Sequence, residues 1–401
     1  MKNVHGGITA AKGFRAAGLH CGIKSGRKPD LALIVADCRC SSAAVFTSNR
    51  AAAAPVIITR NHSQAGRLQA IVANSGSANA CTGNQGLAIA EQTAAITGKL
   101  LGISPRRVAV ASTGKIGAPP SLKALRTGIP RAISALSAKG SREAAAAILT
   151  TDTFTKEAAV QVRILGKTVT IGGIAKGAGM IHPNMATMLA FLTTDLRIPS
   201  APLQKMLASA VDQSFNMVSV DGETSTNDMV VCLANGAAEN ESIERSTGAR
   251  RAFQEALNAV CTELAKMIAR DGEGATKLAE IRVIGAKREN AARIIARRIS
   301  QSPLVKTAFL GEDANWGRIA AAAGSAGVEF DPARISIFFD KVAVVKNGVG
   351  LGPTAERKAA RVLGNQSFTI TLDLRSGNHS ATAWTCDLTE DYIRVNAAYR
   401  S

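Results

Sequence analysis

Short apolar runs alternate with longer helical patterns along the whole chain, and this alternation favours sheets packed in layers and covered by helices. The runs are rich in Ala, Val and Ile and are bounded by Gly, Asn, Ser or Pro, as buried strands are. The predicted strands of the first part are Leu31–Ala36, Ala54–Thr59, Gln69–Ala73 and Arg107–Ala111. The predicted helices are Leu87–Leu101, Pro202–Gln213 and Arg250–Arg270. The expected fold class is therefore α/β (α+β).

The later part of the chain continues the pattern with further strands and tight turns. The predicted strands there are Met188–Thr193, Asp228–Ala234, Ala279–Ile284 and Ile335–Val345. Two hairpins are predicted, Val160–Ile174 with its turn at Gly166-Lys167, and Ser367–Leu374 paired with Ala381–Leu388. The chain has 401 residues, 46% of them hydrophobic, and shows no repeat or linker. This predicts one large domain or two ordinary ones.

The net charge of +18 raises nucleic-acid binding as an alternative function. The basic residues are spread along the chain, with small groups such as Arg106-Arg107, Arg250-Arg251 and Lys287-Arg288. Aromatic residues make up only 4% of the chain and do not interleave with these groups. The stacking platform of single-strand binders is therefore missing. A solvated basic surface that attracts small anions explains the charge better, and no nucleic-acid partner is expected.

Neither a membrane span nor a metal site is expected. No apolar run approaches the ~18 residues that a membrane helix needs, and the N-terminus has no apolar signal region. We therefore expect a cytoplasmic protein that makes no membrane contact. The seven cysteines are scattered and should be reduced. Cys38 and Cys40 are too close together for a standard zinc knuckle, and no second pair completes a site.

The segment Lys176–Phe191, KGAGMIHPNMATMLAF, contains a threonine that can become a catalyst. Thr187 follows the small residue Ala186 and precedes an apolar run, downstream of glycines and a proline that favour an unusual backbone path. A threonine hydroxyl is activated when its own N-terminal amine takes its proton, and an internal threonine gains that amine only by cleavage of the preceding bond. The mechanism needs no histidine base, although His182 lies nearby.

This segment resembles the processing and nucleophile segment of the ornithine acetyltransferase family, called ArgJ. Nine further segments resemble family motifs in the family's order, so that the resemblance covers nearly the whole chain. They are Gly6–Lys24, Lys28–Val35, Ile71–Gly83, Ala111–Gly117, Thr150–Lys156, Ser219–Asp228, Asp271–Lys277, Gly311–Ile319 and Tyr392–Ser401.

The resemblance implies self-cleavage between Ala186 and Thr187. The products would be residues 1–186 and 187–401, which remain interlaced and assemble as two alpha and two beta chains. The implied fold is an αββα-type sandwich of the DmpA/ArgJ-like kind. The implied reaction moves the acetyl group of N2-acetylornithine to glutamate through an acetyl-Thr187 intermediate, in arginine biosynthesis. No metal or organic cofactor is implied.

Three alternatives stay open. The first is a bifunctional enzyme that also acetylates glutamate from acetyl-CoA, for which the sequence offers no deciding mark. The second is an N-terminal-nucleophile aminopeptidase of related fold, although PNMATML differs from the nucleophile segment of those enzymes. The third is the basic nucleic-acid-binding protein already considered.

Thr113 and Gly114 are the implied oxyanion donors. They follow a predicted strand, and a strand-to-loop junction with glycine can direct backbone N–H groups and a hydroxyl at one point, as an oxyanion hole requires. In the family, a Thr-Gly pair in this motif provides the oxyanion donors. The assignment of this role to Thr113 and Gly114 rests on that resemblance.

The resemblance also implies a set of substrate-binding residues. They are Thr153, Lys176, Thr187, Glu273, Asn396 and Ser401. The sequence leaves open whether Thr151 or Thr153 makes the contact. Ser401 stands where the family has threonine, which keeps the hydroxyl and removes a methyl group. Ala178 stands where a serine is usual, and we expect no chemical role for it.

Overall fold

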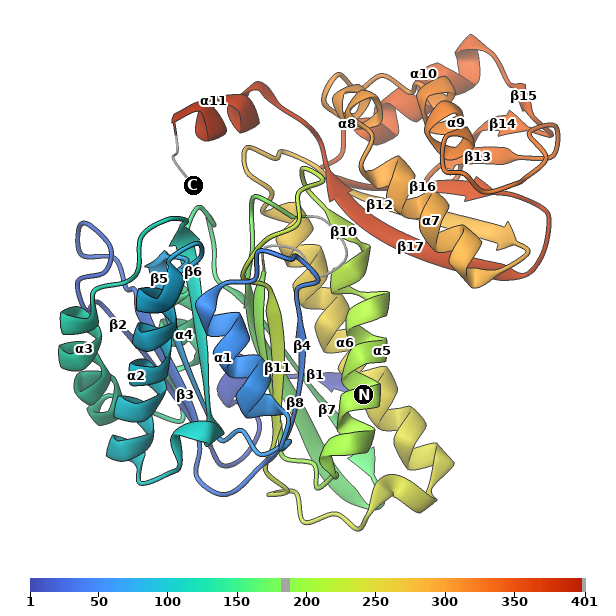
Figure 1. Cartoon of the computed structure of the whole chain (residues 1–401). Coiled ribbons are helices and arrows are strands. Elements are labelled where there is room, and N and C mark those ends of the chain that lie inside the picture. Colours follow the sequence, from blue (N-terminus) through green and yellow to red (C-terminus); the bar gives the residue numbers. More distant parts are fainter. Residues whose placement is uncertain (182–187, 399–401) are drawn as a thin grey trace.

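Two sheets pack face to face at the centre of the molecule (Figure 1). The computed structural model describes residues 1–181 and 188–398. In spatial order the larger sheet contains β1 (Lys2–Asn3), β7 (Lys156–Ile164), β8 (Lys167–Lys176), β9 (Leu189–Thr194), β11 (Met229–Ala234) and β4 (Ser41–Phe46). The smaller sheet contains β2 (Phe14–Leu19), β3 (Leu31–Ala36), β5 (Ala70–Ser77) and β6 (Val108–Lys115).

Apolar side chains of both sheets form a buried layer between them. Ile34 and Ile71 of the smaller sheet, together with Ile174, Phe191 and Val231 of the larger sheet, are fully buried in it. Both faces of these central strands are covered, which explains why they appear in the sequence as continuous apolar runs instead of alternating ones.

Helices cover both outer faces of the two sheets. Against the smaller sheet pack α1 (Ala54–Ser63), α2 (Gly83–Leu101) and α3 (Leu122–Ser134), while α4 (Ser141–Ala147) contacts β2 and β3. Against the larger sheet pack α5 (Ser200–Gln213) and α6 (Thr247–Arg270). The expected αββα-type sandwich is confirmed, as are the helical predictions for the ranges now assigned to α2, α5 and α6.

A third sheet forms a lobe beside the sandwich, drawn in orange and red in Figure 1. Its spatial order is β10 (Val218–Ser219), β17 (His379–Cys386), β12 (Leu278–Ala286), β16 (Ser367–Asp373), β13 (Ser336–Phe339), β14 (Val342–Lys346) and β15 (Val349–Gly350). Its helices are α7 (Glu289–Ser300), α8 (Pro303–Leu310), α9 (Trp316–Gly324) and α10 (Pro353–Leu363). The last helix, α11 (Glu390–Ala398), returns towards the sandwich.

The two predicted pieces of the chain share one sheet. Strands β1, β4, β7 and β8 precede the predicted cleavage point, and β9 and β11 follow it. Leu189 at the start of β9 pairs with Lys176 on one side and with Met229 on the other. A cut at the predicted bond would leave both pieces joined by the hydrogen bonds of this sheet.

Residues 54–59 were predicted as a strand, and this prediction is wrong because they begin helix α1. Pro55 stands at the start of the helix, where its missing N–H costs nothing. Val56 and Ile58 are buried, and the Thr59 hydroxyl donates to the Val110 carbonyl oxygen at 2.7 Å. Six residues are too few for periodicity to separate a buried helix from a buried strand.

The predicted pairing of Ser367–Leu374 with Ala381–Leu388 is also wrong, since β12 lies between β16 and β17. The connecting loop crosses the end of β12, where the Ser376 N–H donates to the Gly285 carbonyl oxygen at 2.7 Å. A strand inserted from a distant part of the sequence leaves no local signal.

Two predicted turns also differ from the structure. The β7–β8 turn lies at Leu165-Gly166, one residue earlier than predicted, and a turn after Phe339 divides the range 335–345 into β13 and β14.

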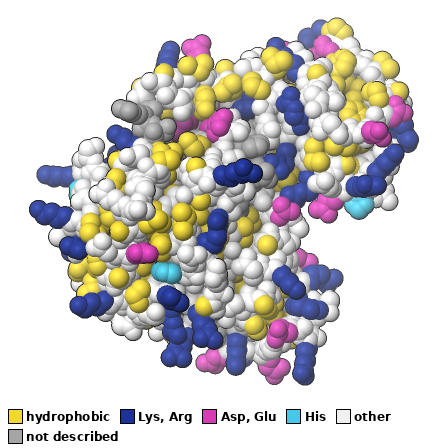
Figure 2. Space-filling model, in the orientation of Figure 1, with side chains coloured by type: hydrophobic (Ala, Val, Ile, Leu, Met, Phe, Trp, Pro, Cys, Tyr) yellow, Lys and Arg dark blue, Asp and Glu magenta, His cyan; other side chains and the backbone are white. Residues whose placement is uncertain are grey.

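Positive side chains do not gather in a single patch on the face shown in Figure 2. Lys and Arg are scattered over it, with Asp and Glu among them. Within the described ranges, none of the helices combines the length and apolar character needed to cross a membrane.

Candidate active site

A pocket lies where the carboxyl ends of β6 and β8 meet the loop after α6 and the helix α11. The residues that line it are Ala78, Thr113, Gly114, Ile116, Thr150, Thr151, Lys176, Gly179, Met180, Asp221, Glu223, Ser225, Thr226, Asn227, Glu273, Tyr392 and Asn396. Five predicted site residues are therefore brought together from distant parts of the chain. They are Thr113, Gly114, Lys176, Glu273 and Asn396. The predicted residues Ala186, Thr187 and Ser401 lie outside the described residues.

The end of β6 presents Thr113 and Gly114 to this pocket. Gly114 pairs with Gly76 of β5, and a Cβ at Gly114 would lie 2.5 Å from the Gly76 carbonyl carbon. Its φ of 127° is one that side chains rarely adopt, so that glycine is required here. Thr113 is buried, and its hydroxyl makes no hydrogen bond within the part of the chain that the structure describes. The hydroxyl is therefore available as a donor to an anion in the pocket.

Asn227 fixes the end of β6 against the larger sheet. Its amide nitrogen donates to the Ser112 carbonyl oxygen at 2.9 Å and to the Ala78 carbonyl oxygen at 2.6 Å. The Ser112 hydroxyl in turn donates to the Asn74 side-chain oxygen at 2.6 Å. These buried bonds hold the residue before Thr113 in place, which is the kind of preorganisation that oxyanion donors need.

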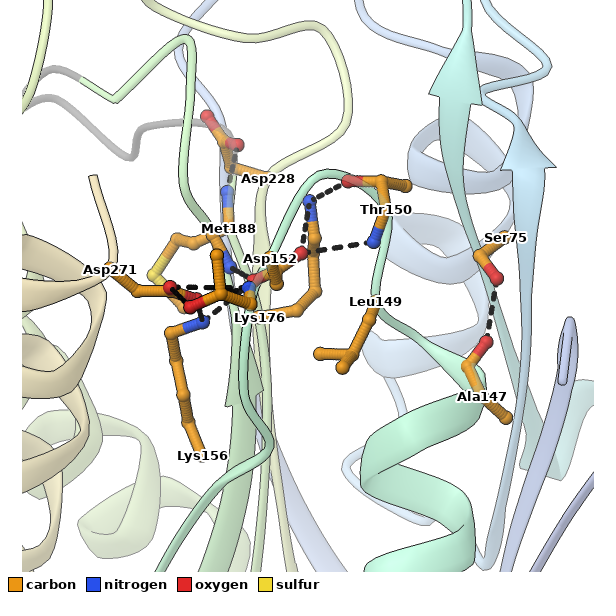
Figure 3. Close-up of polar contacts among 12 residues, drawn as sticks. Ser75, Ala147, Leu149, Thr150, Asp152, Lys156, Lys176, Met188, Asp228 and Asp271 are labelled. Atoms are coloured by element: carbon orange, nitrogen blue, oxygen red, sulfur yellow. Dashed lines mark hydrogen bonds and ion pairs between the residues drawn. The ribbon is translucent and has the colours of Figure 1, made fainter. Parts of the chain in front are cut away.

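Lys176, the last residue of β8, is buried beside the pocket (Figure 3). Its Nζ donates to the Thr150 hydroxyl at 2.8 Å and lies 3.6 Å from Oδ2 of Asp152. Burial alone would raise the pKa of Asp152, but the ammonium groups of Lys176 and Lys156 outweigh it and hold that pKa well below its usual range. An ionised Asp152 therefore fixes the position of the Lys176 ammonium group.

Lys156 extends this network to Asp271, which also holds Thr153. Its fully buried Nζ donates to Asp152 at 2.8 Å and also to Asp271. The Thr153 hydroxyl donates to the same Asp271 carboxylate, and Thr153 does not line the pocket, whereas Thr151 does. The geometry favours Thr151 for the substrate contact that the sequence left open between these two threonines.

Glu273 and Asn396 contact each other in the lining of the pocket. The Asn396 amide donates to Oε2 of Glu273 at 2.8 Å, which joins α11 to the loop after α6. The Glu273 N–H donates to the Ala178 carbonyl oxygen at 2.9 Å. A Cβ at Gly179 would lie 2.4 Å from the Glu273 carboxylate, so that glycine provides the space for this side chain. The predicted pair is thus assembled by direct contact.

Asp228 is a buried carboxylate that contacts the backbone at Met188 (Figure 3). Its Oδ1 accepts the Met188 N–H at 2.8 Å, and within the described residues its Oδ2 accepts no hydrogen bond. Complete burial raises the pKa of Asp228 well above its usual range, although the Met188 N–H and Lys176 act in the opposite direction. The carboxyl group therefore holds the backbone at Met188, the residue bonded to Thr187.

We predict that Asp228→Asn removes a pH-dependent loss of stability. Because the folded state raises this pKa, the stability contributed by the carboxyl group is fully present below the unfolded pKa of about 4 and is lost as pH rises through the folded pKa. The free energy of unfolding of the wild type should thus fall relative to that of the variant above pH ~4. Urea unfolding across a pH series at one protein concentration measures the difference.

The control for this comparison is Asp37→Asn. Asp37 is exposed and paired with Arg15. Its replacement should therefore not make the variant progressively more stable than the wild type as pH rises. A constant gap between wild type and Asp228→Asn across the series would contradict a raised pKa for Asp228.

The sequence interpretation did not assign any role to the carboxylates that organise the site. Asp152, Asp221, Asp228 and Asp271 all lie in segments that resemble family motifs. Asp221 accepts the N–H groups of Met180 at 2.6 Å and Ile181 at 2.8 Å, which lie within the segment Lys176–Phe191 and before the predicted cut. Their place in those motifs was the available signal, but nothing in a single sequence shows that a carboxylate is buried.

No group of three His, Cys, Asp or Glu side chains suited to a metal ion occurs in the described ranges. All seven cysteines are free thiols. Cys38 and Cys40 lie far from the pocket, on the loop before β4.

Comparison with known proteins agrees with the motifs. The model of the ArgJ family matches residues 15–401. The chain is 51% identical over 405 residues, covering 100% of both chains, to the arginine biosynthesis bifunctional protein ArgJ of Symbiobacterium thermophilum. It is 46% identical, again covering 100% of both chains, to the protein of the same name from Caldanaerobacter subterraneus subsp. tengcongensis.

A solved structure gives the same result. The crystal structure of the arginine biosynthesis bifunctional protein ArgJ from Bacillus halodurans shares 43% identity and superposes with a TM-score of 0.50. The match covers 52% of this chain and 97% of that chain. With a family match over most of its length and relatives of this identity, the chain belongs to the ArgJ family.

Proposed function

We propose that this chain is an acetyltransferase that moves the acetyl group of N2-acetyl-L-ornithine to L-glutamate, giving L-ornithine and N-acetyl-L-glutamate. The observation that carries this proposal is the pocket that gathers Thr113, Gly114, Lys176, Glu273 and Asn396 in a member of the ArgJ family. Its lining offers hydrogen-bond donors for an oxyanion, an ammonium group and a carboxylate, which are the groups that an acetylated amino acid and its acceptor require.

Self-cleavage before Thr187 supplies the nucleophile in this proposal. The new α-amine has an ordinary pKa of ~7.7–8.0, which suits a base working close to neutral pH. The solved Bacillus halodurans chain supports the idea, because a match covering 97% of it spans only 52% of this chain. That chain is about half as long as this one, as a separate piece of a divided protein would be.

The steps follow from the groups around the pocket. The Thr187 amine takes the proton of its own hydroxyl, and the hydroxyl oxygen attacks the acetyl carbonyl carbon. Thr113 and the backbone at Gly114 stabilise the negative charge on the carbonyl oxygen. The C–N bond breaks, the ornithine amine leaves with the proton, and acetyl-Thr187 remains. The glutamate amine then attacks this ester, and Thr187 is released with its proton restored.

Lys176 and Glu273 suit the two ends of these substrates. The Lys176 ammonium group, held by Thr150 and Asp152, is positioned to attract a substrate carboxylate. The Glu273 carboxylate, held by Asn396, is positioned to attract an ammonium or amine group. Both substrates carry an α-amino-acid core, so that one pocket can bind them in turn.

The proposal extends to a second acetyl donor and to the assembly of the pieces. The relatives are named bifunctional proteins, which supports acetyl-CoA as a second acetyl donor for glutamate. The release of CoA from acetyl-CoA in the presence of glutamate measures that activity. We further propose that two copies of each piece assemble, as the resemblance to the family implies. The cytoplasmic location stays a prediction.

The experiment that tests the proposed reaction is trapping of the acetylated enzyme. Incubation with N2-acetylornithine alone should add the mass of one acetyl group to the piece 187–401, and glutamate should remove it. Initial rates should give parallel double-reciprocal plots, as expected for a covalent intermediate. Intersecting plots without a trapped acetyl group would indicate direct transfer in a ternary complex and would exclude Thr187 as a covalent nucleophile.

A further inference from the structure

A hollow lined by three arginines lies at the opposite end of the sandwich from the proposed active site. Arg39, Arg67 and Arg107 line it together with Ser41 and Ser200. Arg107 immediately precedes β6, whose other end carries Thr113 and Gly114. The six residue steps from Arg107 to Thr113 span about 20 Å in an extended strand. A ligand in this hollow therefore does not reach the groups proposed to perform acetyl transfer.

The three guanidinium groups have no carboxylate to neutralise them. Within the described part of the chain, none of them takes part in an ion pair or donates a hydrogen bond, and no Asp or Glu lines the hollow. Other arginines differ: Arg15 pairs with Asp37 at 2.7 Å and Arg293 with Asp212 at 2.8 Å. Like charges gathered in one concavity attract anions, because the surrounding protein concentrates their field.

Backbone hydrogen bonds fix the segments that carry these arginines. The Gly66 carbonyl oxygen accepts the Ser42 N–H at 2.9 Å and the Ser200 hydroxyl at 2.7 Å. A Cβ at Gly66 would lie 2.5 Å from the Ser200 side chain, so that the approach of this loop to α5 requires glycine. The Arg107 carbonyl oxygen accepts the Gln69 N–H at 2.8 Å. The arginines thus project from a preorganised frame.

The start of α5 adds positive potential to the hollow. Ser200 is the first residue of this 14-residue helix, and the preceding Pro199 provides no side-chain cap. The N–H groups of a first helical turn attract anions. This contribution adds to that of the three arginines, which carry the full positive charges of the hollow.

We infer that this hollow binds the phosphate group of a small molecule. Guanidinium groups donate paired hydrogen bonds to phosphate oxygens, and several of them around one point match an anion with several oxygens. N2-acetylornithine and glutamate carry carboxylates and no phosphate, so that this site is separate from acetyl transfer between these two substrates. No aromatic side chain lines the hollow, and the base-stacking surface of a single-strand binder is absent from its described lining.

Calorimetric titration of the full chain with inorganic pyrophosphate, ADP and adenosine at low ionic strength tests this inference. Pyrophosphate and ADP should bind saturably, and adenosine should not. Arg67→Gln and Arg107→Gln should each weaken binding roughly tenfold, as expected for the loss of a charge-assisted hydrogen bond. Equal affinity for the two phosphate probes assigns the phosphate groups alone as the ligand, whereas tighter binding of ADP assigns a nucleotide.

Arg106→Gln is the matched control, because it removes the same charge one residue away from the hollow. Its effect on binding should stay below about twofold, since an exposed charge outside the site is screened. All three variants should keep the thermal midpoint and acetyl-transfer rate of the wild type. Absence of saturable binding, or equal weakening by Arg106→Gln, would overturn the inference. Tighter binding of random single-stranded DNA through the same arginines would overturn the assignment to a small molecule.

Discussion

Thr187→Ala is expected to leave one uncut chain with no measurable acetyl transfer. The substitution removes the hydroxyl group that would attack the preceding peptide bond and later the acetyl group. Loss of a nucleophile removes most of the rate enhancement of an enzyme, on the order of 10⁶-fold in a well-studied hydrolase. Intact mass measurement should give two masses for the wild type, for residues 1–186 and 187–401, and a single mass for the variant.

Thr187→Ser is the matched control for this experiment. It keeps both a hydroxyl and, after cleavage, an α-amine, and it should therefore be cut and retain part of the activity. Cleavage of Thr187→Ala at the same bond would show that a separate protease is responsible. Because Asp228 holds the backbone N–H of Met188 in either variant, both should fold with the native order of strands.

The sheet explains how a cut chain can remain one molecule. Strand β9 begins two residues after the predicted nucleophile and is hydrogen-bonded to β8 on one side and to β11 on the other. The first described residues after the predicted cut are held in the same way, since the Met188 N–H donates to the buried Asp228 and Leu189 pairs with the buried Lys176. Separating the pieces would expose the apolar layer that contains Ile174 and Phe191, at a large cost in hydrophobic free energy.

The fold was predictable where one segment carries a long, repeated pattern. Residues 87–101 and 250–270 have clear helical spacing, and both ranges lie within helices. The run 31–36 is apolar at every position because both faces of β3 are covered. The prediction failed where tertiary contacts decide the conformation. Residues 54–59 form a helix whose Thr59 hydroxyl contacts β6, and their sequence alone carries no sign of that contact.

The site was predictable from motifs, but its supporting network was not. The resemblance pointed to Thr113, Gly114, Lys176, Glu273 and Asn396, which line one pocket. Lys176 is paired with Asp152, and Asp152 is joined through Lys156 to Asp271, which lies 115 positions after Lys156. No local pattern in the sequence links such positions. For the same reason the sequence could not decide between the neighbouring threonines at 151 and 153, which face different surroundings.

Thr113→Ala is expected to slow acetyl transfer by a factor of roughly 10²–10³, the usual cost of removing one oxyanion donor. The Thr113 hydroxyl makes no hydrogen bond within the described residues, so that its removal leaves no buried partner unsatisfied. The thermal midpoint should therefore change little, and KM should change less than kcat. Self-cleavage also passes through an oxyanion, and turnover must be compared per molecule of cleaved enzyme.

Thr113→Ser separates the role of the hydroxyl from that of the methyl group. The serine hydroxyl can donate to the same oxyanion, and this variant should retain a turnover within about tenfold of the wild type, because only packing and rotamer preference change. A turnover of Thr113→Ala within about twofold of the wild type would remove the side chain from the mechanism, given the size of the expected loss. The backbone N–H of Gly114, which no side-chain substitution can delete, would then be the remaining donor at the end of β6.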